Sequence, residues 1–131
     1  MSAGRVEEAW SILDGLMQEY PEARDSQFLL QLAGVCAARL GNRSRALEIE
    51  ARLAELGEKE LESNGIFGYN GVTQYRSAQI AAQLGENDRA INLLQQAVTV
   101  GFSNYLLIHR DANFEPLWNN PEFQEILKPK G

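Results

Sequence analysis

The sequence predicts an all-α protein: an antiparallel helix-hairpin solenoid of about two and a half repeats, followed by a short helical C-terminal cap. One observation is a unit that occurs three times, in which a glycine is followed by four residues, an alanine and an apolar helix. It occupies Gly4–Ala9, Gly41–Ala46 and Gly85–Ala90. The glycines are 37 and 44 residues apart, a period typical of helical repeats that stack to bury their apolar faces. A second observation is that apolar residues recur every three or four positions, which is the amphipathic helix period.

A first helix is expected over 5–20, because Pro21 cannot supply the amide that another turn would need. This helix has two apolar stripes, and only one of them can face the next helix. The other would be an exposed apolar patch of the kind found at interfaces. We therefore expect either self-association into a homo-oligomer through helix 5–20, or a chain cut from a longer one whose preceding helix covered the patch. The residues expected at the self-association interface are Val6, Trp10, Leu13 and Met17.

The second and third helices form the first complete repeat. The second is expected over 26–40, with Asp25 or Ser26 as its cap. The glycine that follows it suits the left-handed position after a helix end. The third helix starts near Ser44 and runs to Gly57 or one turn beyond.

A glycine-rich segment, 63–71, separates this repeat from the next. It is expected to be a plain connector, with a binding loop as the alternative. A fourth helix is expected over 72–84. A fifth, over 88–100, would be capped by Asn87 or Asp88. The fifth helix is apolar on more than one side, so we expect it to lie between neighbours.

Composition and charge narrow the class of partner. The chain has 131 residues, 44% hydrophobic and 23% charged, with a formal net charge of −6. Its basic residues are scattered among acidic ones, whereas proteins that bind nucleic acid or anionic membranes carry basic clusters. No apolar run approaches the ~18 residues of a membrane span, and the first residues lack an export signal. We therefore expect a cytoplasmic protein that binds a protein or peptide, and neither nucleic acid nor membrane.

Residues capable of catalysis are sparse. Cys36 is the only cysteine and lies in an apolar helical stretch, so we expect a buried side chain rather than a reactive thiol. His109 is the only histidine; a Ser-His-Asp triad, a two-histidine metal site or a histidine proton relay would each need partners at defined distances, so we expect His109 to cap a helix or make a surface contact. The glycines of 63–71 lack the lysine of a phosphate-binding loop. The sequence therefore predicts no enzyme, no cofactor and no metal site.

The repeat unit resembles the tetratricopeptide repeat (TPR) family. In that pattern a small residue lies in the middle of helix A, a glycine in the turn and an alanine at the start of helix B. Gly34 and Ala78 occupy the small position in helix A, while Glu50 departs from the pattern because an aromatic residue is usual there. The resemblance implies a single TPR-like domain over 1–131. Its parts would be a half repeat 1–24, a repeat 25–62, the loop 63–71, a repeat 72–101 and a C-terminal cap 102–131.

The C-terminal segment resembles the motif that closes repeat arrays in many bacterial proteins. Its pattern is aspartate, two residues, Phe, one residue, Pro-Leu, and then Pro, one residue and Phe, beginning at Asp111. Pro121 suits the first turn of a short helix, and Phe123 then shares one side with later apolar residues. Phe114, Leu117 and Trp118 are expected to seal the last repeat in the same way.

The TPR resemblance also implies where a partner would bind. In that family the A helices line a concave groove that holds a peptide or a partner helix. Amides in such a groove can pair with peptide backbone, and arginine can pair with a carboxylate. A core position remains the alternative for Phe28 and for Tyr75. The groove residues implied by the resemblance are Phe28, Gln31, Val35, Arg39, Val72, Tyr75, Arg76, Gln79 and Gln83.

Two functions follow from the sequence. The first is a non-catalytic protein–protein interaction scaffold that uses this groove. The alternative is a regulatory or sensory C-terminal TPR region of a larger bacterial signalling protein, such as a kinase, a cyclase or a transcription regulator. The resemblance of the C-terminal segment favours the alternative, since arrays that end in this way are often attached to such domains.

Overall fold

The structure, a computed structural model, describes residues 3–64, 71–102 and 105–128. Within these ranges the regular elements are helices only, so the prediction of an all-α chain is confirmed. In chain order they are α1 (Ala3–Glu19), η1 (Pro21–Asp25), α2 (Gln27–Arg39), α3 (Arg43–Asn64), α4 (Val72–Gln83), α5 (Asn87–Thr99), α6 (Tyr105–Arg110), η3 (Ala112–Leu117) and α7 (Pro121–Leu127).

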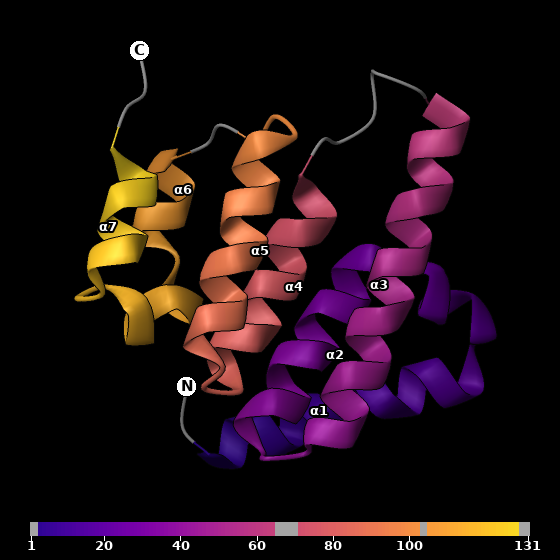
Figure 1. The fold of residues 1–131 in the computed structure, drawn as a ribbon. Coiled ribbons are helices and arrows are strands. Elements are labelled where there is room, and N and C mark those ends of the chain that lie inside the picture. Colours follow the sequence, from indigo (N-terminus) through magenta and orange to yellow (C-terminus); the bar gives the residue numbers. More distant parts are fainter. Residues whose placement is uncertain (1–2, 65–70, 103–104, 129–131) are drawn as a thin grey trace.

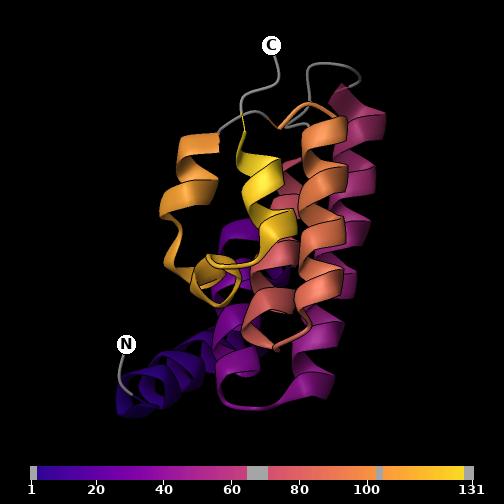
Figure 2. The same ribbon diagram turned by 60° about the vertical axis from the view of Figure 1, so that its left-hand side comes forward.

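Two helical hairpins, α2–α3 and α4–α5, lie side by side at the centre of the molecule (Figure 1). Helix α4 packs against both α2 and α3, and thereby joins the hairpins. Helix α1 packs on α2 but runs at a slant to it (Figures 1 and 2). The short elements α6, η3 and α7 cover the other end, where η3 packs on α4 and α7 on α5. The described chain is thus a row of helices in which α1 lies at one end and the short elements α6, η3 and α7 lie at the other.

Glycines make the tight turns within the hairpins. Gly41 has φ +78°, and its amide donates to the carbonyl of Ala38. The amide of Asn42 donates to the carbonyl of Ala37, so two carbonyls of the last turn of α2 are satisfied. The same pair of bonds closes α4 at Gly85, where φ is +79°. The repeated glycine is therefore the residue that lets each first helix stop and reverse within a few residues.

Most helix ends agree with the sequence, and three features differ. Helix α3 continues to Asn64, about two turns past Gly57, so the first residues of the expected loop 63–71 are helical. Residues 65–70 of that loop lie outside the described residues. The cap of α5 is Glu86, which lies before the predicted cap residues. The fully buried residues of α5, which include Ile91 and Leu94, form one stripe rather than several, but the partly buried Leu93 and Val98 also pack on the core and the helix lies between α4 and α7 as expected.

Small residues allow the hairpins to approach closely. Gly34 of α2 is buried, and a Cβ there would lie 2.9 Å from Cγ1 of Ile80 and 3.2 Å from Cγ2 of Ile49. Ala78 of α4 is fully buried as well. At Gly57 a Cβ would lie 2.5 Å from Oγ1 of Thr73, so α3 and α4 are close at that point too. Larger residues at these positions would push the two hairpins apart.

The buried side chains form two clusters. The N-terminal core lies among α1, α2 and α3 and includes Met17, Leu30, Ile49 and Leu53. Ile80 belongs to this cluster although it comes from α4. The C-terminal core lies among α4, α5 and the last three elements, and its largest members are Tyr75, Leu94, Ile108, Phe114, Leu117 and Phe123. Helix α4 therefore contributes side chains to both cores.

The C-terminal segment packs much as its pattern predicts. Pro121 starts α7, and Asn120 caps it by accepting a hydrogen bond from the amide of Glu122 at 2.9 Å. Phe114 and Phe123 are buried, with ring centroids 6.0 Å apart. Trp118 is the exception: it is exposed, because it follows the last turn of η3 and lies outside the buried cluster.

Candidate functional site

Three of the residues predicted for the groove on α4, Tyr75, Gln79 and Gln83, bind the C-terminal segment of the same chain. Asp111, which caps η3, accepts a hydrogen bond from the hydroxyl of Tyr75. One of its carboxylate oxygens also accepts from Nε2 of Gln79 at 2.5 Å, and the other accepts from the amide of Asn113 at 2.9 Å. Tyr75 and Gln79 are both buried. The carboxylate of Asp111 thus accepts from two side chains of α4 and from one amide of η3, and so joins the two elements.

Tyr75 is part of the C-terminal core rather than a free aromatic anchor. Its ring is stacked on Phe102 with centroids 4.7 Å apart, and it meets the edge of Phe114 at 5.5 Å. Burial raises the pKa of the Tyr75 hydroxyl well above its ordinary value, and the negative charge of Asp111 raises it further. The hydroxyl is therefore a neutral donor to Asp111 at all physiological pH values.

A second set of contacts joins α2 to the same segment. Arg39 donates from Nε to Oε1 of Gln83 at 2.8 Å and from a terminal nitrogen to Oδ1 of Asn113 at 3.3 Å. Gln83 also donates from Nε2 to the carbonyl of Asn113 at 2.8 Å. A shallow depression of about 620 Å³ lies beside these contacts, lined in part by Ala112 and Glu115. Arg39 is exposed at its edge.

The remaining predicted groove residues lie in different environments. Val35 is buried in the N-terminal core, and Gln31 and Val72 are half-buried. Arg76 donates to Oε1 of Gln27 at 2.8 Å and so ties α4 to α2. Phe28 is exposed, which leaves it as the one apolar groove residue on the surface. The structure brings the polar members of the predicted groove together, but it fills the α4 part with η3.

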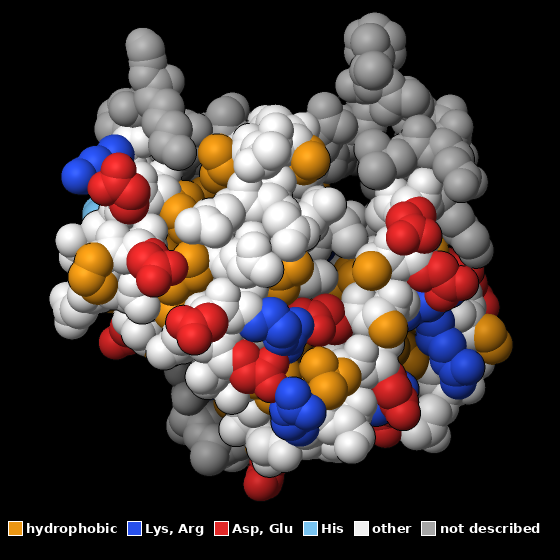
Figure 3. Space-filling view, viewed as in Figure 1, with side chains coloured by type: hydrophobic (Ala, Val, Ile, Leu, Met, Phe, Trp, Pro, Cys, Tyr) orange, Lys and Arg blue, Asp and Glu red, His pale blue; other side chains and the backbone are white. Residues whose placement is uncertain are grey.

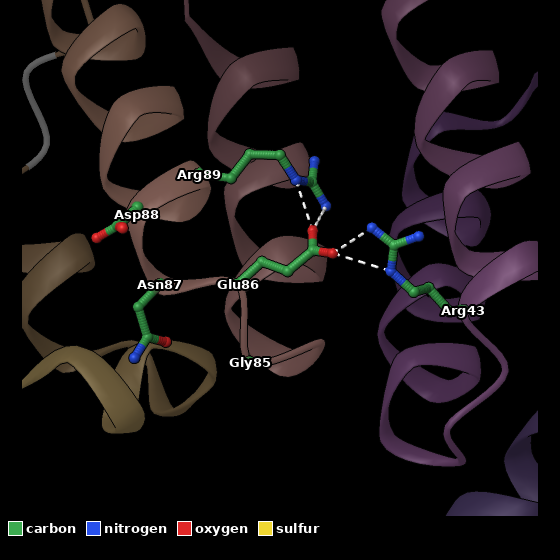
Figure 4. Close-up of a pocket in the computed structure, with 6 residues that line it drawn as sticks. All are labelled: Arg43, Gly85, Glu86, Asn87, Asp88 and Arg89. Carbon is green, nitrogen blue, oxygen red and sulfur yellow. Dashed lines mark hydrogen bonds and ion pairs between the residues drawn. The ribbon is translucent and has the colours of Figure 1, made fainter.

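A charged cluster on another face links the two hairpins. Figure 4 shows Glu86 between two guanidiniums, Arg43 of α3 and Arg89 of α5. Arg89 also donates to both carboxylate oxygens of Glu50, at 2.6 Å each. In Figure 3 this region is a patch of neighbouring blue and red side chains below the centre of the molecule. The sequence shows only that Glu50 departs from the repeat pattern, and the fold identifies Arg89 of α5 as its partner.

The pKa values of the two carboxylates of this cluster are shifted in opposite directions. Burial raises the pKa of Glu50, in spite of the hydrogen bonds from Arg89. Hydrogen bonds from Arg43 and Arg89 lower the pKa of Glu86, which is less buried. Every charge of the cluster has an opposite charge beside it, so the arrangement holds α3 against α5 and presents no free ligand-binding charge.

Five of the exposed large apolar side chains in the described residues lie on or next to α1 and α2, and the others, Val100, Leu106, Leu107 and Trp118, lie in the C-terminal part of the chain. Ile12, Leu16 and Tyr20 follow one another at intervals of four residues, so they form one row on α1. Phe28 and Leu32 form a second row on α2, which packs against α1 and follows it after the five residues of η1. Ile12 is 61% exposed and Phe28 62% exposed. We call these five residues the α1–α2 surface.

The structure corrects the stripe expected for self-association. Val6, Leu13 and Met17 are buried against α2, and Met17 is only 1% exposed. Trp10 is half-buried, and the guanidinium of Arg45 lies 6.0 Å from its ring centroid. Both stripes on helix 5–20 were visible in the sequence, but the side that meets α2 depends on how α1 crosses it. The exposed row matches neither of the two predicted stripes, Ala9-Leu13-Leu16-Tyr20 and Val6-Trp10-Met17, because Ile12 belongs to neither and Leu13 is buried.

Unpaired carboxylates accompany the α1–α2 surface. Within the described residues, Glu7, Glu8, Glu19 and Glu22 have no ion-pair partner. The other two acidic residues of this region are paired with arginines of α3, Asp14 with Arg45 and Asp25 with Arg52. The three arginines of α1, η1 and α2 have no ion-pair partner in the described part of the chain either: Arg24 donates to the carbonyl of Met17, and Arg39 donates to Gln83 and Asn113. Only Arg5 lies on α1, so the unpaired charge of α1 itself is mainly negative. The surface is therefore apolar with an acidic border.

The remaining residues with reactive side chains do not form a cluster in the part of the chain that the structure describes. In residues 3–64, 71–102 and 105–128, no group of three or more His, Cys, Asp or Glu side chains is placed to hold a metal ion. Cys36 is buried as expected, and burial raises the pKa of its thiol. His109 is exposed in the last turn of α6. Across the described helices, none combines the length and apolar character needed to cross a bilayer.

Comparison with known proteins gives no match. No protein-family model matches the chain, and no curated protein or solved structure is significantly similar to it.

Proposed function

We propose that this chain is a non-catalytic protein-interaction module of TPR-like helical hairpins, and that it binds a partner helix on the α1–α2 surface. Support for the TPR-like assignment comes from the two side-by-side hairpins, the glycine turns and the small residues where the hairpins meet. The resemblance rests on these features and on the sequence pattern alone. The assignment of binding rests on a different observation.

That observation is the contrast between the two A helices, α2 and α4. On α4, Tyr75, Gln79 and Gln83 are bonded to Asp111 and Asn113, so a partner would have to displace these two residues. On α2, by contrast, Phe28 and Leu32 are exposed, and α1, which packs on α2, carries the exposed row Ile12, Leu16 and Tyr20. Groups of exposed apolar residues of this kind mark interaction sites on soluble proteins. The binding site that we propose therefore lies at the α1 end of the predicted groove.

Site-specific photo-crosslinking in the native cell tests this proposal. Phe28 and Trp118 are both exposed aromatic residues, so each can be replaced in turn by a photoreactive phenylalanine analogue. We expect protein adducts from position 28 that are absent from position 118. The adducts should also disappear when Ile12→Ser is added. The same adducts from both positions, or none from position 28, would contradict the proposal.

A further inference from the structure

The charge around the α1–α2 surface indicates what kind of helix would bind there. Glu8 lies one turn before Ile12 on α1, and Glu19 lies three residues after Leu16, so these carboxylates border the apolar row. Both are exposed and have no ion-pair partner in the part of the chain that the structure describes. A partner that buries the row therefore brings its own flanking residues next to unneutralised negative charge.

Building on the proposed function, we infer that the partner is a basic amphipathic helix: an apolar stripe for Ile12, Leu16 and Phe28, with lysine or arginine along its edges. Cations at the rim of an interface pair with such carboxylates, raise the rate of association and select against acidic partners. The row from Ile12 to Tyr20 spans eight residues, or about 12 Å, which matches two turns of a partner helix.

A helix fits this surface better than an extended peptide does. A helix satisfies its own backbone amides and carbonyls, so it can lie on apolar side chains without loss of hydrogen bonds. An extended peptide would need backbone partners, and the exposed rows of α1 and α2 are made of apolar side chains. The amide and guanidinium groups that could serve an extended chain, Gln83 and Arg39, are bonded to Asn113.

The same charges disfavour a second copy of this chain as the occupant. In a symmetric dimer each patch meets its own equivalent, so the carboxylates of both copies would border one interface. On α1, three unpaired glutamates, Glu7, Glu8 and Glu19, lie on the same helix as one exposed and unpaired arginine, Arg5, so that arrangement concentrates like charge. A heterologous, cationic partner removes the repulsion.

Three synthetic helices of about 18 residues test the inference, a length at which an isolated helix can form. All carry the same leucine stripe, and their flanking positions are lysine, glutamine or glutamate. Binding to the full chain is followed by fluorescence anisotropy at low and at physiological salt. We expect the lysine helix to bind at least about tenfold more tightly than the glutamate helix, with a difference that shrinks as salt rises.

Two pairs of matched variants locate the binding. Glu8→Gln/Glu19→Gln should weaken binding of the lysine helix about fivefold, whereas Glu115→Gln/Glu122→Gln changes the net charge equally and should have less than a twofold effect. Ile12 and Leu106 are 61% and 59% exposed, so Ile12→Ser should abolish binding of all three helices and Leu106→Ser should not. Circular dichroism checks that each variant retains its helical content.

The outcomes separate the inference from the proposed function. Equal binding of all three helices at the α1–α2 surface would leave the proposed function standing and overturn the basic partner. No binding of any helix, or equal loss with Ile12→Ser and Leu106→Ser, would overturn both. Light scattering that shows a dimer dissociated by Ile12→Ser would identify a second copy as the occupant and would also overturn the inference.

Discussion

At the scale of single residues, Gly34 and Gly15 are two helical glycines in opposite environments. A Cβ at Gly34 would overlap Ile80, whereas nothing lies within 4 Å of a Cβ at Gly15. We expect Gly34→Ala to destabilise the fold by about 1–3 kcal/mol through overpacking, despite the better helix propensity of alanine. The matched Gly15→Ala should instead stabilise it by up to about 1 kcal/mol. Urea unfolding measures both, and a stabilised Gly34→Ala variant would show that the hairpins can move apart at no cost.

Tyr75 gives a second residue-scale prediction, for alkaline pH. The unfolded chain releases the Tyr75 proton near the ordinary pKa of 10.0, whereas burial and Asp111 raise the folded pKa. The unfolded state therefore binds fewer protons above pH 10, so the stability contribution is complete below that pH and is lost as pH rises. The loss is up to about 1.4 kcal/mol per pH unit. Tyr75→Phe should remove this slope in the unfolding free energy, and the exposed Tyr20 provides the control, since Tyr20→Phe should leave the slope unchanged.

At the scale of elements, the charged cluster couples α3 to α5, and its two partners should respond unequally to substitution. Arg89→Gln leaves the half-buried carboxylate of Glu50 without its hydrogen-bonded cation, which we expect to cost about 3 kcal/mol. Glu50→Gln removes a carboxylate that burial already disfavours in its charged form, as its raised pKa shows. Arg89 still has its ion pair with Glu86, so the cost should stay below about 1 kcal/mol. Thermal or urea unfolding of both variants measures the difference.

The pH dependence of the Arg89→Gln variant provides an internal check. Without Arg89, the folded pKa of Glu50 rises further above its unfolded value. A raised pKa means that the folded state gains a proton first as pH falls, so the penalty of the variant should shrink on acidification through that pKa. If the loss of unfolding free energy in Arg89→Gln instead grows on acidification, the folded protein stabilises the charged form of Glu50 even without Arg89.

The elements themselves were largely predictable, because their signals are local. Ser26 caps α2 by accepting from the amide of Leu29, Gly41 reverses the chain, and Pro121 starts α7. The site was less predictable, since it depends on what covers each face. Tyr75 and Gln79 have suitable groove chemistry, but Asp111, more than thirty residues later, takes their hydrogen bonds. On α1 the buried residues Val6, Leu13 and Met17 come from both predicted stripes, because the crossing of α1 over α2 decides which side of the helix is covered.

At the scale of the whole molecule, α4 is the element on which cooperativity depends. It packs against α2, α3, α5 and η3, and its residue Ile80 lies in the N-terminal core while Tyr75 lies in the C-terminal core. In a row of stacked helices each unit is stabilised mainly by its neighbours, so the two halves unfold together only if their interface is strong enough. Ile80 is fully buried at that interface.

We therefore expect Ile80→Ala to cost about 2–5 kcal/mol and to uncouple the two halves. Trp10 reports on the N-terminal end and Trp118 on the C-terminal segment, so Trp118→Phe and Trp10→Phe each leave a single tryptophan as a local probe. With Ile80 intact, the fluorescence midpoints in urea should coincide. In the Ile80→Ala background the two midpoints should separate. Trp10 should report the lower midpoint, because the main packing partners of α1 are only α2 and η1. Coincident midpoints in both backgrounds would mean that the charged cluster and the α3–α4 contact at Gly57 suffice to hold the halves together.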